Sequence, residues 1–294
     1  MSHRLYCDTE FHISDSCSRS RRRCGTMSEN QDQSELRSEP PAQPNIETLG
    51  LIGTGMIGSV LARLAVAAGL NVVLSNSRGP ETLADLVAEL GEQARAATPA
   101  EAARAGDLVV ATIPLRAYTR LSPTDLAGKV VIDTMNYYPE RDDRIAELDA
   151  AELTTSELVQ RHLAGSRVVK AFNNIDFRRL FTSARPAGAA DRSALPLAGD
   201  DAEAKARVAR LLDVLGYDAV DIGPLAESWR SEPGTSVYVL PYMAARPKGM
   251  DEEATGRWFF ETPGVTLSAD RVRELTATTD RAPAGGSSTA ITDD

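Results

Sequence analysis

The sequence predicts an α/β protein in which a doubly wound, mostly parallel sheet is covered by helices on both faces. Short apolar segments alternate with segments of helical periodicity, and this alternation is typical of parallel strands joined by right-handed crossovers. A glycine triplet lies between the first apolar segment and the first helical one, where such folds place a tight turn. A small C-terminal extension follows the alternating part.

The first two strand–helix units follow directly from the residue pattern. A strand is expected at residues 48–52 and an amphipathic helix at 56–68. The next apolar segment, 70–74, precedes a helix with leucine and valine at helical spacing. The residues on that face are Leu83, Leu86, Val87 and Leu90.

The middle of the chain continues the pattern. A short strand at 94–97 leads to a helix that begins after Thr98 with proline in its first turn. Residues 107–113 form a continuous apolar run, as in a strand buried in a parallel sheet, and 129–133 repeat it.

The later elements are marked by a capping box and three apolar runs. Thr154 and Glu157 have the spacing of a capping box for a helix that runs to about Leu163. Strands are expected at 166–172, 194–198 and 217–222, with a helix at 201–215.

The chain is expected to have four parts. Residues 1–45 resemble a non-globular leader, because a basic run is followed by a stretch rich in Glu, Gln, Ser and Pro. Translation from Met27 is the simplest explanation of the first residues, and a disordered tail is the alternative. The main domain is expected at 46–224, a small C-terminal segment at 225–275 and a disordered tail at 276–294.

Composition excludes several classes of function. The formal net charge of −10 argues against a nucleic-acid partner and against binding to an anionic membrane. No apolar run approaches the roughly 20 residues of a membrane helix. The cysteines, Cys7, Cys17 and Cys24, have no metal or redox spacing, so we expect no metal site and a reducing, cytoplasmic location.

The C-terminal segment differs from the rest in its aromatic content. Trp229, Tyr238, Tyr242 and a Trp-Phe-Phe run beginning at Trp258 lie there. The segment is too short for an independent core. We therefore expect it to pack against the sheet or against a second subunit in a homodimer.

The glycine triplet predicts a dinucleotide site. The three glycines lie in the six-residue motif Gly53, Thr54, Gly55, Met56, Ile57 and Gly58, directly after the first strand. In this motif the first glycine permits the tight turn, the second lets backbone approach a pyrophosphate, and the third lets the helix pack closely. The phosphates then meet unpaired N–H groups at the positive end of the helix dipole.

The end of the second strand indicates which dinucleotide binds. NAD sites usually have Asp or Glu here, to accept from the ribose 2′-hydroxyl. This chain has Ser77 and Arg78 instead. Arg binds phosphate with charge-assisted, often bidentate hydrogen bonds, so the pair predicts NADP(H). The alternative is that Arg78 is only a solvated turn residue.

The other strand ends lack a strong acid or base. Ligands bind beyond the carboxyl ends of the strands in such sheets, and there the candidates are Ile113, Pro114, Asn136, Ala171 and Asn173. The asparagines can bind a nicotinamide amide or a substrate carbonyl, but they cannot transfer protons. No catalytic residue is therefore expected. Hydride exchange between two redox cofactors suits such a site, because each cofactor carries its own electronics.

Five further residues have other expected roles. Asp133 ends a strand and is expected to cap the following loop. His162 is expected at the end of a helix, where it favours the dipole. Tyr137 and Tyr138 precede a proline; they could act weakly as acid or base, but packing is the expected role. Lys170 precedes its strand end.

Four stretches resemble the NADP-dependent oxidoreductase family that uses the deazaflavin coenzyme F420. They are the glycine loop at 53–58, the turn at 77–78, Ala198-Gly199-Asp200-Asp201 and Asp221-Ile222-Gly223-Pro224-Leu225. The resemblance covers roughly residues 46–230. It implies hydride transfer between NADP(H) and F420, with the glycine loop on the pyrophosphate, Ser77 and Arg78 on the 2′-phosphate, and Ile113 and Pro114 near the nicotinamide.

The sequence departs from that family in two places. Members that use F420 often carry His and Pro after the sixth strand, where this chain has Phe172-Asn173-Asn174-Ile175. The part beyond about residue 235 does not match the family's C-terminal helices. The same N-terminal module occurs in pyrroline-carboxylate reductases and in the cytoplasmic domain of membrane metalloreductases. Two alternatives therefore stay open. The second substrate could be a flavin or a small imine or carbonyl compound, or the protein could be a non-catalytic redox sensor that binds NADP(H).

Overall fold

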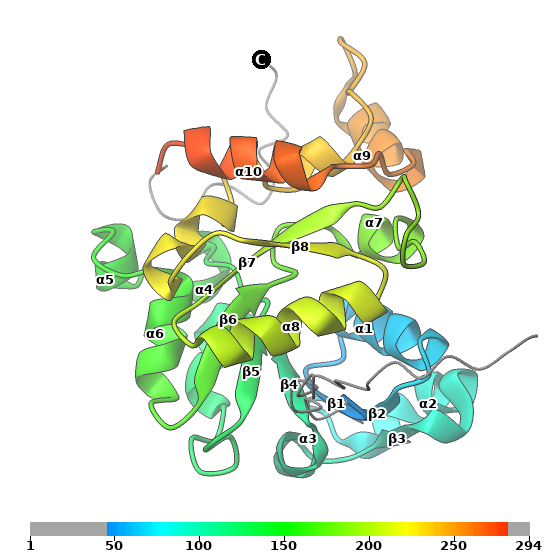
Figure 1. The fold of residues 1–294 in the computed structure, drawn as a ribbon, viewed down its shortest axis with the longest axis vertical. Coiled ribbons are helices and arrows are strands. Elements are labelled where there is room, and N and C mark those ends of the chain that lie inside the picture. Colours follow the sequence, from blue (N-terminus) through cyan, green and yellow to red (C-terminus); the bar gives the residue numbers. More distant parts are fainter. Residues whose placement is uncertain (1–45, 282–294) are drawn as a thin grey trace, which may run out of the picture. The chain divides into compact units, whose positions relative to one another are not determined.

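The computed structural model describes residues 46–281. Within this range, eight strands form one sheet (Figure 1). Their order is β3-β2-β1-β4-β5-β6-β7-β8. The strands are β1 (Thr48–Ile52), β2 (Asn71–Ser75), β3 (Ala94–Ala96), β4 (Leu108–Ala111), β5 (Val130–Asp133), β6 (Arg167–Ala171), β7 (Ala194–Gly199) and β8 (Asp218–Asp221). The first six follow the doubly wound order of dinucleotide-binding folds, so the predicted fold class is confirmed.

The helices alternate with the strands as the sequence predicts. They are α1 (Met56–Ala67), α2 (Ala84–Leu90), α3 (Pro99–Ala105), α4 (Pro139–Asp142), α5 (Ala146–Asp149), α6 (Thr155–His162), α7 (Phe177–Thr182), α8 (Ala202–Val214), α9 (Glu252–Glu261) and α10 (Ala269–Thr278). Short 3₁₀ turns are η1 (Pro80–Leu83), η2 (Gly91–Gln93), η3 (Leu115–Arg120), η4 (Leu225–Ser231) and η5 (Leu240–Tyr242). A capping box at Thr154 begins α6, as expected, and α3 begins after Thr98 with Pro99 in its first turn, as expected, where Thr98 also forms a capping box.

The last two strands reverse direction. β7 runs antiparallel to β6, with Val169 opposite Gly199, and β8 is parallel to β7. The chain between β6 and β7 contains only the short helix α7, which packs against α1 instead of crossing the sheet. The simple strand–helix alternation did not reveal this reversal, because periodicity alone does not encode strand direction.

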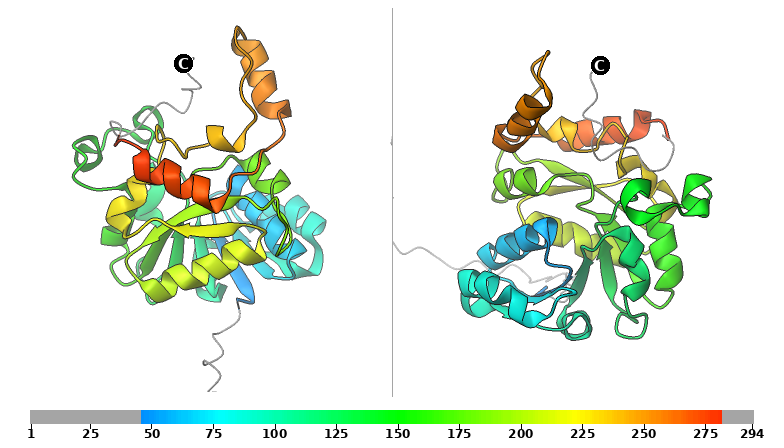
Figure 2. Two further views of the ribbon diagram at one scale, coloured as in Figure 1. Left: turned by 45° about the horizontal axis from the view of Figure 1, so that its top comes forward. Right: turned by 180° about the vertical axis from the view of Figure 1, so that it is seen from behind.

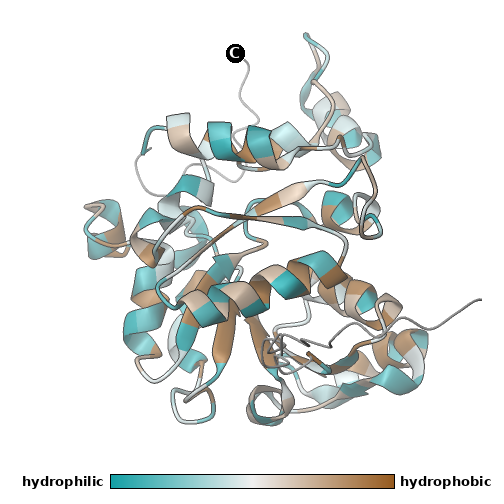
Figure 3. Cartoon of the chain, viewed as in Figure 1, coloured by the Kyte–Doolittle hydropathy of each residue, from teal (hydrophilic) through white to brown (hydrophobic). Residues whose placement is uncertain are grey.

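The strands are apolar on both faces because helices cover both. Leu108 and Val110 of β4 belong to a core with α1 and α8, while Val109 and Ala111 face a second core with α6. Side chains alternate between faces along a strand, so consecutive apolar residues serve the two cores. Figure 3 shows the same arrangement, with hydrophobic strands between helices that are polar on their outer sides.

The C-terminal segment packs against the sheet, which is one of the two arrangements expected for it. The Leu267 carbonyl accepts from the Ala194 N–H at the start of β7 at 2.8 Å, and the Tyr242 hydroxyl donates to the Ala194 carbonyl at 2.9 Å. α10 lies beside β7 and β8 and ends at Thr278, past the boundary drawn at residue 275, because Leu275 and Thr276 are buried. Figure 2 shows α9 projecting outward from this region.

Two expectations concern residues beyond the described part. The leader at 1–45, with its proposed start at Met27, and most of the tail lie outside residues 46–281. Within that range, every helix is too short or too polar to cross a membrane.

Candidate functional site

The glycine loop is tied to the neighbouring strand ends. Gly53 has φ +101°, which a side chain would strain, and its N–H donates to the Ser75 carbonyl at 2.9 Å. The Thr54 hydroxyl donates to the same carbonyl at 3.0 Å, and Thr112 donates to the Gly53 carbonyl. A Cβ on Gly58 would lie 2.2 Å from the Gly53 oxygen. The motif glycines thus have the backbone roles that the sequence predicts.

The outer side of the loop is open. A Cβ added to Gly55 would meet nothing within 4 Å, and the neighbouring Met56 is 67% exposed. The first turn of α1 has no side-chain cap and no acidic residue, although α3 and α6 are both capped by threonine. Free N–H groups at the positive end of a helix are what a pyrophosphate needs, so the residues present fit that group.

The turn after β2 presents Ser77 and Arg78 to solvent. Asn76 Oδ1 accepts from the N–H groups of Arg78 at 2.9 Å and Gly79 at 3.0 Å, and its Nδ2 donates to Thr82 at 2.8 Å. Both predicted residues are exposed. The shape of the turn therefore depends on Asn76, which the sequence analysis did not select although Asn in such a turn commonly bonds its own backbone.

Ile113 and Pro114 lie beside the glycine loop at the end of β4. Ile113 Cγ2 is 2.8 Å from the position that a Cβ of Gly53 would occupy. Pro114 is the N-cap residue of η3. Both apolar residues thus lie beside the loop of the predicted dinucleotide site, and their contact with a nicotinamide stays a prediction.

Asn136 and Asn173 meet where β5 and β6 end. Asn136 Nδ2 donates to the Asn173 carbonyl at 2.8 Å, and Asn173 Nδ2 donates to Asn136 Oδ1 at 3.1 Å. Asn173 also donates to the Ser231 carbonyl at 2.7 Å. The two amides are engaged mainly with each other and with η4, while each amide oxygen keeps a second acceptor site that a nicotinamide N–H could use.

Ala171 does not reach this open edge. Its side chain is 0% exposed and its backbone pairs with Leu197 of β7. The antiparallel strand β7 covers the position, and that reversal was absent from the sequence expectation. A contact between Ala171 and a nicotinamide is therefore not what this structure supports.

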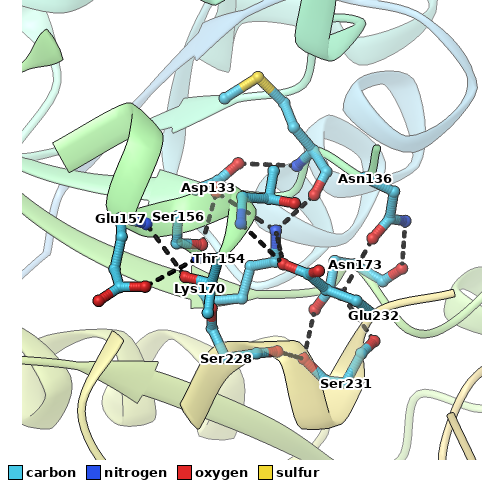
Figure 4. A network of polar contacts seen from close by, with 12 residues as sticks. Asp133, Asn136, Thr154, Ser156, Glu157, Lys170, Asn173, Ser228, Ser231 and Glu232 are labelled. Atoms are coloured by element: carbon cyan, nitrogen blue, oxygen red, sulfur yellow. Dashed lines mark hydrogen bonds and ion pairs between the residues drawn. The ribbon is translucent and has the colours of Figure 1, made fainter. Parts of the chain in front are cut away.

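A buried ion pair joins β5 and β6 just below the asparagines (Figure 4). Lys170 Nζ lies 3.3 Å from Asp133 Oδ2 and donates to the Met135 carbonyl, and both charged side chains are at most 1% exposed. Asp133 also accepts from the Met135 N–H at 2.8 Å and from the Ser156 hydroxyl at 2.7 Å. Asp133 thus caps its loop as expected. It also pairs with Lys170, which lies before the end of its strand and was not expected at the site.

The same network reaches the C-terminal segment. Glu232 follows η4, and its Oε1 lies 4.0 Å from Lys170 Nζ and accepts from the Thr155 N–H at 3.2 Å. Asp133 and Lys170 are direct neighbours in the register of β5 and β6. Pairing β5 with β6 in this register is enough to bring Asp133 and Lys170 together. Glu232 comes from a distant segment, so strand pairing does not predict its approach to Lys170.

The loop after β6 is held in an uncommon conformation. Phe172 has φ +61° although it is not glycine, and it is 1% exposed. The Asn174 carbonyl accepts from Val239, which also has a positive φ, and Asn174 Nδ2 donates to the Val237 carbonyl at 3.1 Å. The C-terminal segment therefore fixes the loop that carries Asn173, at the edge where the strands end.

Two tyrosine hydroxyls lie beside the asparagines. The Tyr138 and Tyr238 hydroxyls are hydrogen-bonded to each other, and Asn136 Nδ2 lies 3.5 Å from the Tyr238 oxygen. Burial raises the pKa of both tyrosines. Tyr137, by contrast, is a packing residue as predicted, because it is 2% exposed and bonds Asp149. Tyr138 also has a polar partner, because the Tyr238 hydroxyl reaches it from a segment 100 residues away.

The remaining polar candidates do not form a metal site. Among residues 46–281, no group of three or more His, Cys, Asp or Glu could hold a metal ion. His162 is the last residue of α6, where its Nε2 lies 2.9 Å from the Leu121 carbonyl and its ring meets Tyr118 edge-on. This is the helix-end position expected for it.

The fold and the open glycine loop define a dinucleotide-binding protein, and comparison with known proteins specifies the class. Residues 48–137 match the family described as NADP oxidoreductase, coenzyme F420-dependent, so the resemblance drawn from the motifs is confirmed over that range. The match covers β1 to β5 and the start of the following loop, including Ser77 and Arg78. NADP-dependent oxidoreductase is accordingly the class that these residues support.

Individual proteins are similar to this chain. Metalloreductase STEAP3 of Rattus norvegicus is 28% identical over 195 residues, which is 66% of this chain but only 36% of that protein. The chain thus spans about a third of the length of this curated relative. A hypothetical protein, SMa0349, of Sinorhizobium meliloti has a solved structure with a TM-score of 0.59 and 28% identity, covering 66% of this chain and 94% of that one.

A second solved structure is provisionally assigned as an F420-dependent NADP reductase of Arthrobacter sp. FB24. It has a TM-score of 0.52 and 25% identity, and the alignment covers 63% of this chain and 87% of that one.

Proposed function

We propose that this protein is an oxidoreductase that transfers a hydride between NADP(H) and a second redox cofactor, coenzyme F420. The observation that carries the proposal is the open, uncapped glycine loop beside an exposed Ser77–Arg78 turn. Residues 53–58 would hold the pyrophosphate and Ser77 and Arg78 the 2′-phosphate. The description of the matching family and of the Arthrobacter relative supports F420 as the partner.

Bound NADPH would supply the hydride, and the residues of this chain would position it. Ile113 and Pro114 offer an apolar wall beside the glycine loop, and Asn136 lies at the next strand end. Holding two reacting rings in a fixed relative orientation lowers the entropic part of the barrier. We further propose a cytoplasmic location, since the chain has no cysteine after Cys24, and a homodimer, supported by the exposed Phe260 on α9.

The experiment mixes purified protein with NADPH and oxidised F420 and follows the deazaflavin absorbance. We expect loss of the oxidised deazaflavin band together with oxidation of NADPH. If FMN or a cyclic imine is turned over and F420 is not, that compound replaces F420 as the second substrate, and the protein remains an NADP-dependent oxidoreductase. Tight NADPH binding with no turnover of any of the three would favour a redox sensor.

A small imine or carbonyl is the second candidate substrate, and one observation favours it. The Tyr138 and Tyr238 hydroxyls provide O–H donors at the strand ends, where the sequence offered no acid. Reduction of a C=N or C=O bond needs a proton as well as a hydride. The name of the STEAP3 relative refers to metal reduction by that protein.

A further inference from the structure

Hydrogen bonds run in one direction through the ends of β5 and β6. Ser231 Oγ donates to Asn173 Oδ1 at 3.2 Å, and Asn173 Nδ2 donates to Asn136 Oδ1 at 3.1 Å. The orientation of each amide is fixed, because its Nδ2 also faces a backbone carbonyl, which can only accept: Ser231 O for Asn173 and Asn173 O for Asn136. The direction of the chain is therefore set by backbone acceptors.

This chain of hydrogen bonds reaches the two tyrosine hydroxyls. Asn136 Nδ2 faces the Tyr238 oxygen at 3.5 Å, and either tyrosine hydroxyl can donate to the other. The electrostatics favour Tyr238 as the donor, because burial raises the pKa of both tyrosines, while their shared hydrogen bond lowers the pKa of Tyr138 and raises the pKa of Tyr238. The Tyr138 oxygen then accepts. Its own proton is not used within this cluster and is left for a group outside it.

The surroundings of Tyr138 suit a proton donor. Tyr138 is partly exposed and lies two residues after Asn136, beyond the end of β5. β5 is separated from β1 only by β4, and strands lie about 4.8 Å apart, so the end of β5 is roughly 10 Å from the glycine loop. Burial raises the pKa of Tyr138, which keeps it protonated at neutral pH. The Arg141 guanidinium, 4.8 Å from its ring centroid, and the Tyr238 hydroxyl stabilise the phenolate that remains.

We propose that Tyr138 is the proton donor to the second substrate and that Tyr238 is a positioning residue for it. This inference rests on the proposed function and adds a proton path to it. A hydride leaves C4 of NADPH and forms a C–H bond on the acceptor, while the acceptor's conjugated C=N electrons move to nitrogen. The Tyr138 O–H bond breaks and an N–H bond forms. NADPH becomes NADP⁺, the acceptor gains two electrons, and the phenolate takes a proton from water.

The test compares Tyr138→Phe, Tyr238→Phe and the control Tyr137→Phe, which removes a neighbouring hydroxyl that bonds Asp149 instead. Single-turnover oxidation of NADPH is followed with F420, FMN and a cyclic imine. We expect Y138F to slow the step about 100-fold or more, the range of general acid catalysis, and to regain rate when a weak-acid buffer such as imidazolium is added. Y238F should slow it about 10-fold without buffer rescue, Y137F should stay within about 2-fold, and NADPH affinity should be unchanged in all three.

The outcomes separate the two proposals. F420 turnover by wild type with Y138F within about 2-fold of it overturns the role of Tyr138 and keeps the function. Turnover of the imine alone, with the loss and buffer rescue in Y138F, supports Tyr138 and removes F420. Equal losses in Y137F and Y138F assign a structural role to Tyr138 and overturn the proposal. No turnover of any acceptor by wild type overturns both.

Discussion

Arg78 stands at the position that decides between the two nicotinamide dinucleotides. Its backbone is held by Asn76, so the guanidinium projects from an ordered turn instead of a loose loop. A 2′-phosphate carries negative charge that Arg can neutralise through charge-assisted hydrogen bonds. One carboxylate of the same turn, Glu81, lies against Gly79.

Replacing Arg78 with Ala should weaken NADPH binding by about 1.5–3 kcal/mol, the magnitude of a hydrogen bond to a charged group. NADH lacks the 2′-phosphate, so its affinity should change little. Titration of both dinucleotides by calorimetry measures the difference. Arg273→Ala is the control, because it removes the same charge from exposed α10. Equal weakening of NADPH and NADH in R78A would contradict the assignment of the 2′-phosphate site.

At the scale of elements, Gly55 in the turn after β1 and Gly58 in the first turn of α1 have opposite surroundings. A Cβ on Gly58 would meet the Gly53 carbonyl, whereas a Cβ on Gly55 would meet open space. Gly55 also has φ −90°, which other residues adopt. Gly58 is needed for packing within the protein, and we expect Gly55 to serve the approach of a ligand.

The two alanine variants should therefore behave differently. Gly58→Ala should lower the free energy of unfolding by about 1–3 kcal/mol, the cost of overpacking. Gly55→Ala should leave that free energy within about 0.5 kcal/mol of wild type and weaken NADPH and NADH alike, because its methyl group occupies the phosphate side. Urea denaturation and dinucleotide titration of both variants measure these effects. A destabilised G55A with normal binding would show that the loop faces away from the ligand.

The Asp133–Lys170 pair links β5 to β6 and should matter for stability. Lys170→Met leaves a buried carboxylate without its cation, which should lower the free energy of unfolding by about 3–5 kcal/mol. The exposed pair Arg161–Glu147 is the matched control, and Arg161→Ala should cost less than about 1 kcal/mol. Urea denaturation measures both. Similar losses in the two variants would mean that the buried pair is hydrated in solution.

Sequence patterns predicted what is local and missed what is distant. The strand runs, the capping boxes and the glycine loop each depend on residues a few positions apart, and their elements formed at the expected places. Asp133 and Lys170 meet only because β5 and β6 are paired in register, and Tyr138 meets Tyr238 only because the C-terminal segment returns to the strand ends. No periodicity encodes such contacts, so the site was incomplete before the structure was known.

At the scale of the whole molecule, the C-terminal segment is part of the same unit as the sheet. Residues 46–281 cluster within one compact unit, and Leu225 is buried in the core that faces α6. Asn173 and Ser231 join the loop after β6 to η4 through two hydrogen bonds. The segment should therefore unfold together with the sheet.

The two tryptophans, Trp229 and Trp258, both lie in this segment and make the expectation measurable. In Trp258→Phe the fluorescence reports Trp229 in η4, whereas far-UV circular dichroism reports the strands and helices as a whole. Coincident urea transitions are expected, because a single cooperative unit gives the same midpoint by every probe. The circular dichroism midpoint of W258F should match wild type, which checks that the substitution is neutral. A fluorescence transition at lower urea would show that η4 detaches first, and it would place the Tyr138–Tyr238 contact on a segment that opens before the dinucleotide-binding sheet.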